Sequence, residues 1–271
     1  MPTPLLHVDA FADAPFTGNP AAVCLLEAAR SAHWMQALAA ELNLPATVFV
    51  VRAPDGFAVR WFSPAAELTL CGHGTLAAAH VLWETARLSR AEVARFVTRS
   101  GPLSAVSRGG WIAIDLPAAP ATGTTAPVGL LDALGTKARW VGRNRLDYVV
   151  EIEDEAAVRA LTPDLNALAA VETRGVIVTA RAATPGIDFV SRFFAPRAGI
   201  PEDPVTGSAH TCLAPLWASR LGTPRLTARQ LSSRGGLVRA SVEGDRVVLS
   251  GQAVTIFRAE LDSLDSLDSL D

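Results

Sequence analysis

The sequence predicts an α+β fold of two similar lobes, each built from short strands around one apolar helix. Two observations support this prediction: part of the chain repeats itself, and strand-like segments far outnumber helical ones. The length of 271 residues also suits two domains of about 100–150 residues better than one. An apolar fraction of 49% is enough to supply each lobe with a core.

The repeat relates residues 59–83 to residues 190–218. Each copy contains arginine, two aromatic residues, a small residue and proline, Arg60–Pro64 in the first and Arg192–Pro196 in the second. Each then passes an acidic residue and a glycine-containing turn into an apolar, alanine-containing run. With a three-residue insertion in the second copy, Cys71-Gly72-His73-Gly74 falls opposite Thr206-Gly207-Ser208-Ala209. The alternative is a chance similarity of two strand-to-helix junctions, which the length of the shared pattern disfavours.

Short β-branched or alternating segments, bounded by Gly, Pro, Asn or Asp, predict the strands. In the first half these segments are residues 5–11, 21–26, 46–51, 57–63 and 111–117. In the second half they are residues 145–152, 175–180, 189–195, 237–244 and 246–261.

Three segments predict helices. Residues 31–42 begin at Ser31, a favourable N-cap residue, and residues 75–86 and 208–221 follow the two glycine turns. Pro215 lies inside the third segment and predicts a helix break or a late helix start.

A stretch rich in Ala, Pro, Thr and Gly, residues 116–127, predicts the linker between the lobes. We therefore expect an N-terminal lobe at residues 1–117 and a C-terminal lobe at residues 118–258, with the alternative that the last strand crosses between lobes. Residues 259–271 form a low-complexity acidic tail, for which a frayed helix or a disordered end is expected.

The composition limits the class of partner and the compartment. A formal net charge of −3 offers no attraction for nucleic acid or for an anionic membrane surface. Three cysteines spread far apart argue against a disulfide framework and for a reducing compartment. The N-terminal residues lack a signal-peptide pattern, and no run has the roughly 20 apolar residues of a membrane span. We expect a soluble, cytoplasmic protein.

In both copies of the repeat a glycine turn leads into a helix N-terminus. Unpaired backbone N–H groups and the helix dipole favour an anion at such a position. If the two lobes face each other across a cleft, both helix starts point towards one ligand, and a small carboxylate is the ligand expected there. The alternative is that each glycine only lets a strand and a helix pack closely.

Cys71 and His73 are candidate reactive residues in the first turn. A helix N-terminus favours the thiolate form of a cysteine, whereas a buried cysteine is often an inert small core residue. A zinc site needs more ligands, and neither His80 nor His210 stands at a metal-like spacing, so no metal is expected. A cysteine hydrolase would need an orienting carboxamide that the sequence does not reveal.

Glu202 and Asp203 precede the second turn. An Asp followed by Pro commonly forms a turn and nothing more. Here Asp203 stands three residues before the predicted anion-binding turn, so an acid/base role opposite His73 and Cys71 would suit the transfer of a proton within a small acid. His210, one helical step further on, is more readily interpreted as a packing histidine.

The chain resembles the phenazine-biosynthesis PhzF-like family, which is related to diaminopimelate epimerase. The matching stretches run from Val8 to about Glu260 and include VDAFADAPFTGNPAAVCLL, ELNLPATVFV, CGHGTLAAAH and EDPVTGSAH. The resemblance implies a diaminopimelate epimerase-like fold of two pseudo-symmetric lobes, each with a curved, mostly antiparallel sheet around a central helix. It also implies a cofactor-independent isomerase that works by proton transfer between the lobes, usually as a homodimer.

Carried over residue by residue, the resemblance implies catalytic roles for Asp203 and His73. The residues expected to bind the substrate carboxylate, or to border the cleft, are Gly72, Gly74, Thr75, Gly207, Ser208, Ala209, Gly18 and Asn19.

Two departures from the family pattern matter for mechanism. The stretch that usually carries a proton-shuttling glutamate reads NLPATVFV, with Pro45 and Ala46 in place of serine and glutamate. In relatives of the epimerase type two cysteines face each other, but here Thr206 takes the place of the second, which disfavours a two-thiol mechanism.

The leading hypothesis is therefore an isomerase that uses Asp203 and His73, with Cys71 as substitute for the absent glutamate. A dehydratase-type lyase is a second hypothesis. A protein that binds a small carboxylate or a protein partner, with altered or lost activity, is the third.

Overall fold

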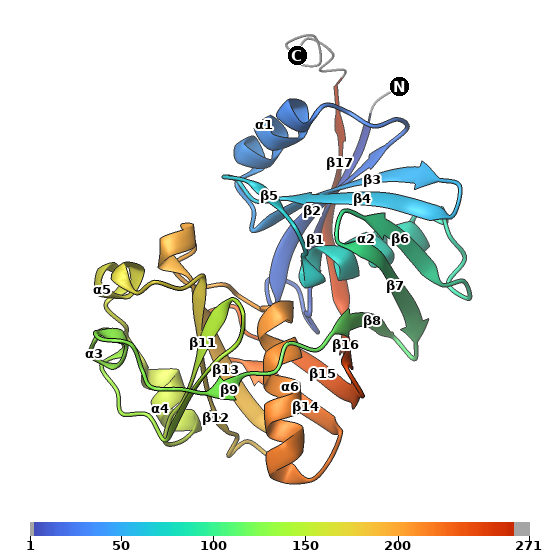
Figure 1. Cartoon of the computed structure of the whole chain (residues 1–271). Coiled ribbons are helices and arrows are strands. Elements are labelled where there is room, and N and C mark those ends of the chain that lie inside the picture. The colour runs from blue at the N-terminus through green and yellow to red at the C-terminus, as the bar shows by residue number, and fades with distance from the viewer. Residues whose placement is uncertain (1–2, 263–271) are drawn as a thin grey trace. The chain divides into compact units, whose positions relative to one another are not determined.

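The computed structural model describes residues 3–262, which divide into two compact units (Figure 1). The first unit contains the described residues up to Asp115 and those from Ser250 onward, and the second contains Leu116–Leu249. The end of the chain returns to the first unit because β17 (Ala253–Leu261) pairs with β1 (Thr3–Ala10) along its whole length. The sequence predicts a second lobe up to residue 258 and a tail at 259–271, with the alternative that the last strand crosses between lobes; β17 follows that alternative. Residues 259–261 belong to β17, and residues 263–271 lie outside the described range.

The first unit is a mixed sheet with helices on both faces. Strand β1 pairs antiparallel with β2, β2 parallel with β3, and β3 antiparallel with β4. Beyond β4 the sheet continues through β5 and β6 to β7 and β8. The bounds are β2 Asn19–Leu26, β3 Ala46–Ala53, β4 Gly56–Phe62, β5 Glu67–Leu68, β6 Ala94–Thr98, β7 Gly101–Arg108 and β8 Trp111–Pro117.

Two helices cover this sheet. Helix α1 (Ala32–Leu42) packs its Trp34 and Met35 against Phe49 and Phe62. Helix α2 (Gly72–Glu84) packs against β1, β2 and β3 and is buried on nearly every side, as expected of an apolar helix at the centre of a fold (Figure 1).

The second unit repeats this plan. Strand β11 pairs parallel with β12, β12 antiparallel with β13, β13 parallel with β14, and β14 antiparallel with β15. Strand β10 pairs antiparallel with both β9 and β11. The bounds are β9 Thr122–Gly123, β10 Trp140–Arg143, β11 Asp147–Glu151, β12 Gly175–Arg181, β13 Phe189–Phe194, β14 Arg225–Gln230, β15 Gly236–Glu243 and β16 Arg246–Gly251.

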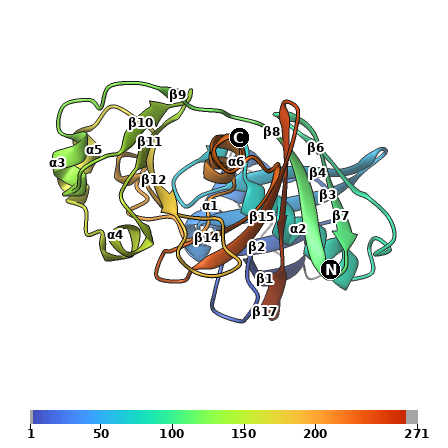
Figure 2. The same cartoon turned by 90° about the horizontal axis from the view of Figure 1, so that it is seen from below.

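The helices of the second unit are one long central helix and several short ones. Helix α6 (Gly207–Leu221) packs against β14 and β15 (Figure 2). The short helices help to enclose a separate apolar cluster that includes Leu130, Val158 and Leu168. Their bounds are α3 Leu130–Leu134, α4 Glu155–Ala160, α5 Leu165–Ala170 and the 3₁₀ helix η1 Pro196–Ala198.

The predicted α+β class is confirmed. Two predicted segments need correction: residues 246–261 form two strands, β16 and β17, instead of one, and α6 differs from the expectation at Pro215. The sequence predicted a break or a late start there, but α6 runs through the proline without interruption. A proline leaves the carbonyl four residues earlier without its helical donor. That carbonyl, on Thr211, accepts the backbone N–H of Ala119 at 3.1 Å instead, which removes the main penalty.

The repeated Arg-aromatic-aromatic motif performs the same task in both units. Arg60 donates to Glu67 through Nε at 2.7 Å and Nη2 at 2.8 Å, and Arg192 donates to Glu202 through the same two atoms at 2.7 and 2.9 Å. Each guanidinium also lies over an aromatic ring of its own motif, at 5.1 Å from Phe62 and 4.9 Å from Phe194. We call these two ion pairs the arginine clamps. Each fixes the loop that leads to the central helix of its unit.

Candidate functional site

Helix α2 begins at Cys71, which is its N-cap residue. The thiol accepts a hydrogen bond from the backbone N–H of Gly74 at 3.4 Å, and the side chain is only 5% exposed. Thr75 donates both its backbone N–H and its hydroxyl to the Cys71 carbonyl, at 2.9 and 2.7 Å. The first turn of α2 is therefore closed by its own residues, and it holds the sulfur at the positive end of the helix.

His73 lies between this thiol and Asn19. The Cys71 sulfur is 3.6 Å from Nδ1 and 3.7 Å from Nε2 of the imidazole, and Asn19 Nδ2 is 3.3 Å from Nδ1. The Asn19 amide and the imidazole therefore share one hydrogen bond, which links β2 to the start of α2. Burial lowers the pKa of His73 to about 4, so the ring is neutral near pH 7. We call Asn19, Cys71 and His73 the α2 cluster; its histidine is neutral near pH 7.

Two glycines are required for this geometry. Gly18 has a φ of +68°, and a Cβ there would lie 2.3 Å from the carbonyl oxygen of Ala10. A Cβ on Gly74 would lie 3.0 Å from the Cys71 sulfur and 2.9 Å from Cδ1 of Trp61. Glycine at these positions lets the backbone carry Asn19 to His73 and lets the helix start come close to the sheet.

Ala46 is fully buried in β3, next to Ala21 of β2. Side chains alternate along a strand, so Ala46 faces the same side of the sheet as Val48, whose methyl group is close to Gly74. Trp61 is paired with Val48 in register, and its buried Nε1–H has no hydrogen-bond partner among the described residues. A polar donor thus lies on the α2 side of β3 and β4, where the sequence has alanine instead of the expected glutamate.

Helix α6 begins at Thr206, but the Thr206 side chain does not cap the helix. Its hydroxyl donates to Oδ2 of Asp203 at 2.5 Å instead. Asp203 is largely buried, with 9% of its surface exposed. Its backbone N–H donates to the carbonyl of Phe193 at 3.0 Å. A hydrogen bond donated to a carboxylate favours its charged form, so Thr206 supports Asp203 as a base.

Gln230, at the end of β14, is fully buried beside Thr206. Its Oε1 accepts the Thr206 backbone N–H at 2.9 Å, and its Nε2 donates to the Asp203 carbonyl at 2.7 Å and to the Thr206 hydroxyl at 3.2 Å. Asp203, Thr206 and Gln230 form the α6 cluster. The sequence analysis missed Gln230, although a glutamine continuing the buried alternation of Leu226 and Ala228 is a signal that could have identified it.

Ser208 lies in the first turn of α6 and accepts a hydrogen bond from Arg174 at 3.0 Å. The same guanidinium donates through Nε to the buried Asp147 at 2.8 Å and pairs with its second oxygen. Arg174 therefore brings a positive charge to the start of α6. It lies next to Ser208, for which the family resemblance implies a role in binding the substrate carboxylate. Gly207 and Ala209, the other predicted residues of this turn, are buried in the helix start.

His210 has a structural role that matches that of Thr75. Its Nδ1 lies 2.8 Å from the carbonyl of Thr206, so Nδ1–H donates to the N-cap carbonyl, as the Thr75 hydroxyl does in α2. The ring is fully buried, and burial lowers its pKa to about 4 despite the opposing effect of this hydrogen bond. The prediction of a packing histidine agrees with these contacts.

The other two cysteines, Cys24 and Cys212, are buried outside the two clusters. Burial raises the pKa of Cys24 and of Cys212 to about 12, which makes both thiols inert near neutral pH. Among residues 3–262, no three His, Cys, Asp or Glu side chains are grouped in a way that could hold a metal ion. The helices within that range are also too short, or too polar, to cross a bilayer.

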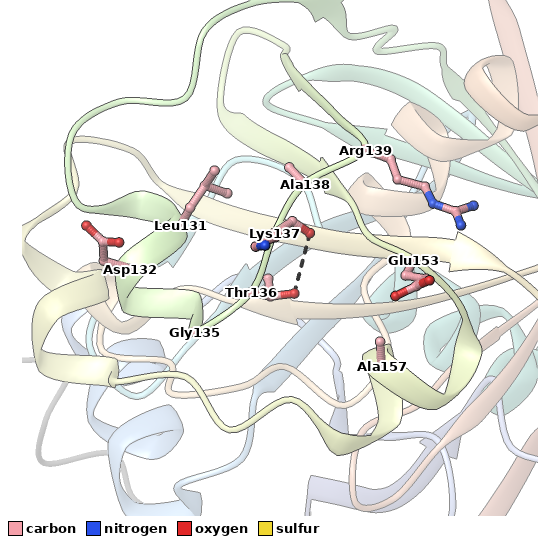
Figure 3. A pocket seen from close by; sticks show the side chains of 9 residues that line it. All are labelled: Leu131, Asp132, Gly135, Thr136, Lys137, Ala138, Arg139, Glu153 and Ala157. Atoms are coloured by element: carbon pink, nitrogen blue, oxygen red, sulfur yellow. Dashed lines mark hydrogen bonds between the residues drawn. The ribbon is translucent and has the colours of Figure 1, made fainter.

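A hollow of about 740 Å³ lies on the second unit, and none of the predicted site residues lines it (Figure 3). The hollow is lined by side chains of both signs of charge: Lys137, Arg139, Asp132 and Glu153. These side chains lie on an open surface, where water weakens their electrostatic effect, so the hollow does not compete with the two buried clusters as a catalytic centre.

Comparison with known proteins agrees with the architecture. The chain has the diaminopimelate epimerase-like fold: a predicted epimerase from Pseudomonas aeruginosa matches with a TM-score of 0.74 at 22% identity, over 96% of this chain and 99% of that one. At this identity the likeness concerns the fold alone.

Closer relatives establish the family. The family model for phenazine biosynthesis-like proteins matches residues 8–259. An uncharacterised isomerase from Halalkalibacterium halodurans is 47% identical over 96% of this chain and 99% of its own length. The crystal structure of a PhzF-family protein from Enterococcus faecalis matches with a TM-score of 0.92 at 40% identity, over 97% of this chain and 100% of that one. The chain belongs to the phenazine biosynthesis-like (PhzF) family.

Proposed function

We propose that the protein is a cofactor-independent isomerase that moves a proton within a small carboxylic acid, with the residues of the α2 and α6 clusters as its candidate acid/base groups. The observation that carries the proposal is the presence of a buried acid/base cluster at the N-terminus of the central helix in each unit. Membership of a family with relatives named isomerases supports the same reaction class.

In the proposed mechanism, backbone N–H groups at a helix start bind the substrate carboxylate. Asp203 removes a proton from carbon, so that the C–H bond breaks and its electron pair shifts through the substrate. Cys71, in contact with the neutral His73, delivers a proton to a second carbon, where a new C–H bond forms. Exchange with solvent then returns the proton from Asp203 to the thiolate. The product has the formula of the substrate.

The test is a panel of small hydroxy, amino and unsaturated carboxylic acids incubated with the protein in D2O and analysed by mass spectrometry and NMR. We expect one acid to give an isomer that carries one solvent deuterium. Asp203→Asn should lower its turnover by about 10²–10⁴-fold, and Cys71→Ser should also slow it. Asp132→Asn, a change at an exposed carboxylate, is the matched control and should leave turnover unchanged. Unchanged turnover in both Asp203→Asn and Cys71→Ser would refute the assignment.

Two other outcomes correspond to the alternative functions. A product lighter by one water, with no deuterium in the recovered substrate, indicates a dehydratase. Calorimetric binding of an acid without any turnover across the panel indicates a binding protein, which is the alternative favoured by Ala46.

Ala46→Glu tests whether the absent glutamate limits activity. The new carboxylate would lie on the sheet face of Trp61, whose unpartnered Nε1–H is a suitable donor. If the protein lacks only the proton-shuttling glutamate, Ala46→Glu raises turnover. Ala46→Gln adds the same bulk without a titratable group and should not raise it. The predicted homodimer stays a prediction.

A further inference from the structure

Gln230 is the feature of the α6 cluster that the proposed reaction does not yet use. It is 0% exposed, it lies 24 residues beyond Thr206 in the sequence, and it makes three hydrogen bonds within the cluster. A buried carboxamide costs free energy unless its donors and acceptors are paired, so its presence at this point needs an explanation.

The partners of Gln230 fix which way its amide points. The Thr206 backbone N–H can only donate, so the atom 2.9 Å from it is Oε1. The Asp203 carbonyl can only accept, so the atom 2.7 Å from it is Nε2. Both requirements are met by one orientation of the amide, and in that orientation Nε2 also donates to the Thr206 hydroxyl oxygen at 3.2 Å.

This orientation determines the direction of the next hydrogen bond. The Thr206 oxygen receives a hydrogen from Gln230, so its own hydrogen is available to Asp203 Oδ2, 2.5 Å away. The relay from Gln230 through Thr206 to Asp203 is thus made of neutral donors that all point towards the carboxylate.

We propose that Gln230 is a positioning residue which, through Thr206, holds the Asp203 carboxylate in one orientation and in its charged form. The role rests on the proposed function of Asp203 as the base. It also explains why Thr206 cannot replace the second thiol of the epimerase type: its hydroxyl hydrogen is already donated to Asp203.

The test is a titration of the Asp203 carboxyl carbon by NMR in protein labelled with ¹³C-aspartate, the signal being assigned with Asp203→Asn. Thr206→Val removes the donor while keeping the side-chain shape, and Thr206→Ser keeps it. Gln230→Glu replaces the amide donor with an acceptor, which competes with Asp203 for the Thr206 hydroxyl. We expect the titration midpoint to rise by about one pH unit in Thr206→Val and in Gln230→Glu, and to stay near the wild-type value in Thr206→Ser.

Equal midpoints in wild type, Thr206→Val and Gln230→Glu, with near-UV circular dichroism unchanged, would overturn the proposal. If Gln230→Glu fails to fold, the Val and Ser pair at Thr206 still tests the final hydrogen bond, and Gln230→Met tests the first. The titration needs no substrate, so it separates this proposal from the proposed function. A shifted midpoint together with full turnover in Asp203→Asn would support the relay and reject Asp203 as the base.

Discussion

In the first unit the central helix starts at Cys71, whose sulfur accepts a backbone N–H. In the second unit it starts at Thr206, whose hydroxyl donates to Asp203. Around these two residues the construction is the same, because an arginine clamp precedes each helix and a side chain four residues into it donates to the N-cap carbonyl. The two units therefore share the contacts that hold the start of the central helix, and they differ in the reactive side chains found there.

The two clusters also differ in charge. The α2 cluster contains a thiol beside a histidine that burial keeps neutral near pH 7. The α6 cluster contains a carboxylate supported by neutral donors. The proposed isomerisation needs both a proton donor and a proton acceptor.

The largest effect is expected from acid, through the buried histidines His73 and His210. Their pKa values fall from 6.5 to about 4 in the folded state, so between these values the unfolded chain binds protons that the folded chain does not. Stability therefore falls as the pH drops from about 6.5 to 4. Between pH 7 and pH 5, each histidine should lower the free energy of unfolding by about 2 kcal/mol.

Urea unfolding at the two pH values measures this loss. His210→Thr copies Thr75 of the first unit and should remove about half of the pH dependence attributed to the pair, whatever its effect at pH 7. An unchanged difference between pH 7 and pH 5 in both His210→Thr and His73→Asn would contradict the assignment.

The arginine clamps should differ in strength. In Arg192→Met, Glu202 loses the two donors described above and the Leu161 carbonyl loses a donor at 2.6 Å, so we expect a cost of about 3 kcal/mol. In Arg60→Met, Glu67 keeps Arg99, and the expected cost is about 1 kcal/mol. Equal losses in chemical denaturation would show that the clamps are energetically equivalent despite their different partners.

The smallest effect is expected at Pro215, which distinguishes α6 from α2. A proline inside a helix usually costs about 3 kcal/mol, largely through the carbonyl it leaves unpaired. Because Ala119 already pairs with that carbonyl, Pro215→Ala should change the free energy of unfolding by less than about 1 kcal/mol. A stabilisation of about 3 kcal/mol in thermal unfolding would mean that the Ala119 hydrogen bond does not compensate.

The sequence predicted the architecture well because the signals are local. Alternating apolar residues identified the central strands, and Ser31 marked the start of α1, where it accepts the Trp34 backbone N–H. Strand β14 was missed because Arg225 and Arg229 occupy its exposed positions, so the segment lacks the apolar content of the other strands. The continuity of α6 could not be predicted, since it depends on Ala119, which is close to Pro215 only in the folded chain.

The sequence predicted only part of the candidate site, because it reveals local motifs but not contacts between residues far apart in the chain. Cys71, His73 and Asp203 stand next to glycine turns, and the sequence shows that directly. Their partners lie far away in the chain: Asn19 lies on β2 and Gln230 on β14. The orientation of a buried side chain depends on such distant partners, which is why the contact of His73 with Asn19 and the direction of the Thr206 hydrogen bond could not be predicted.

We propose that Cys71 and Asp203 both contribute to the isomerisation. The most direct test of this proposal is the rate of solvent-deuterium incorporation into a verified substrate by Asp203→Asn, Cys71→Ser and the double variant. Residues that act as a unit show strongly non-additive effects, so we predict that the double variant reacts at about the rate of the slower single variant. Two single effects that multiply in the double variant would contradict their joint action, because Cys71 and Asp203 would then contribute independently.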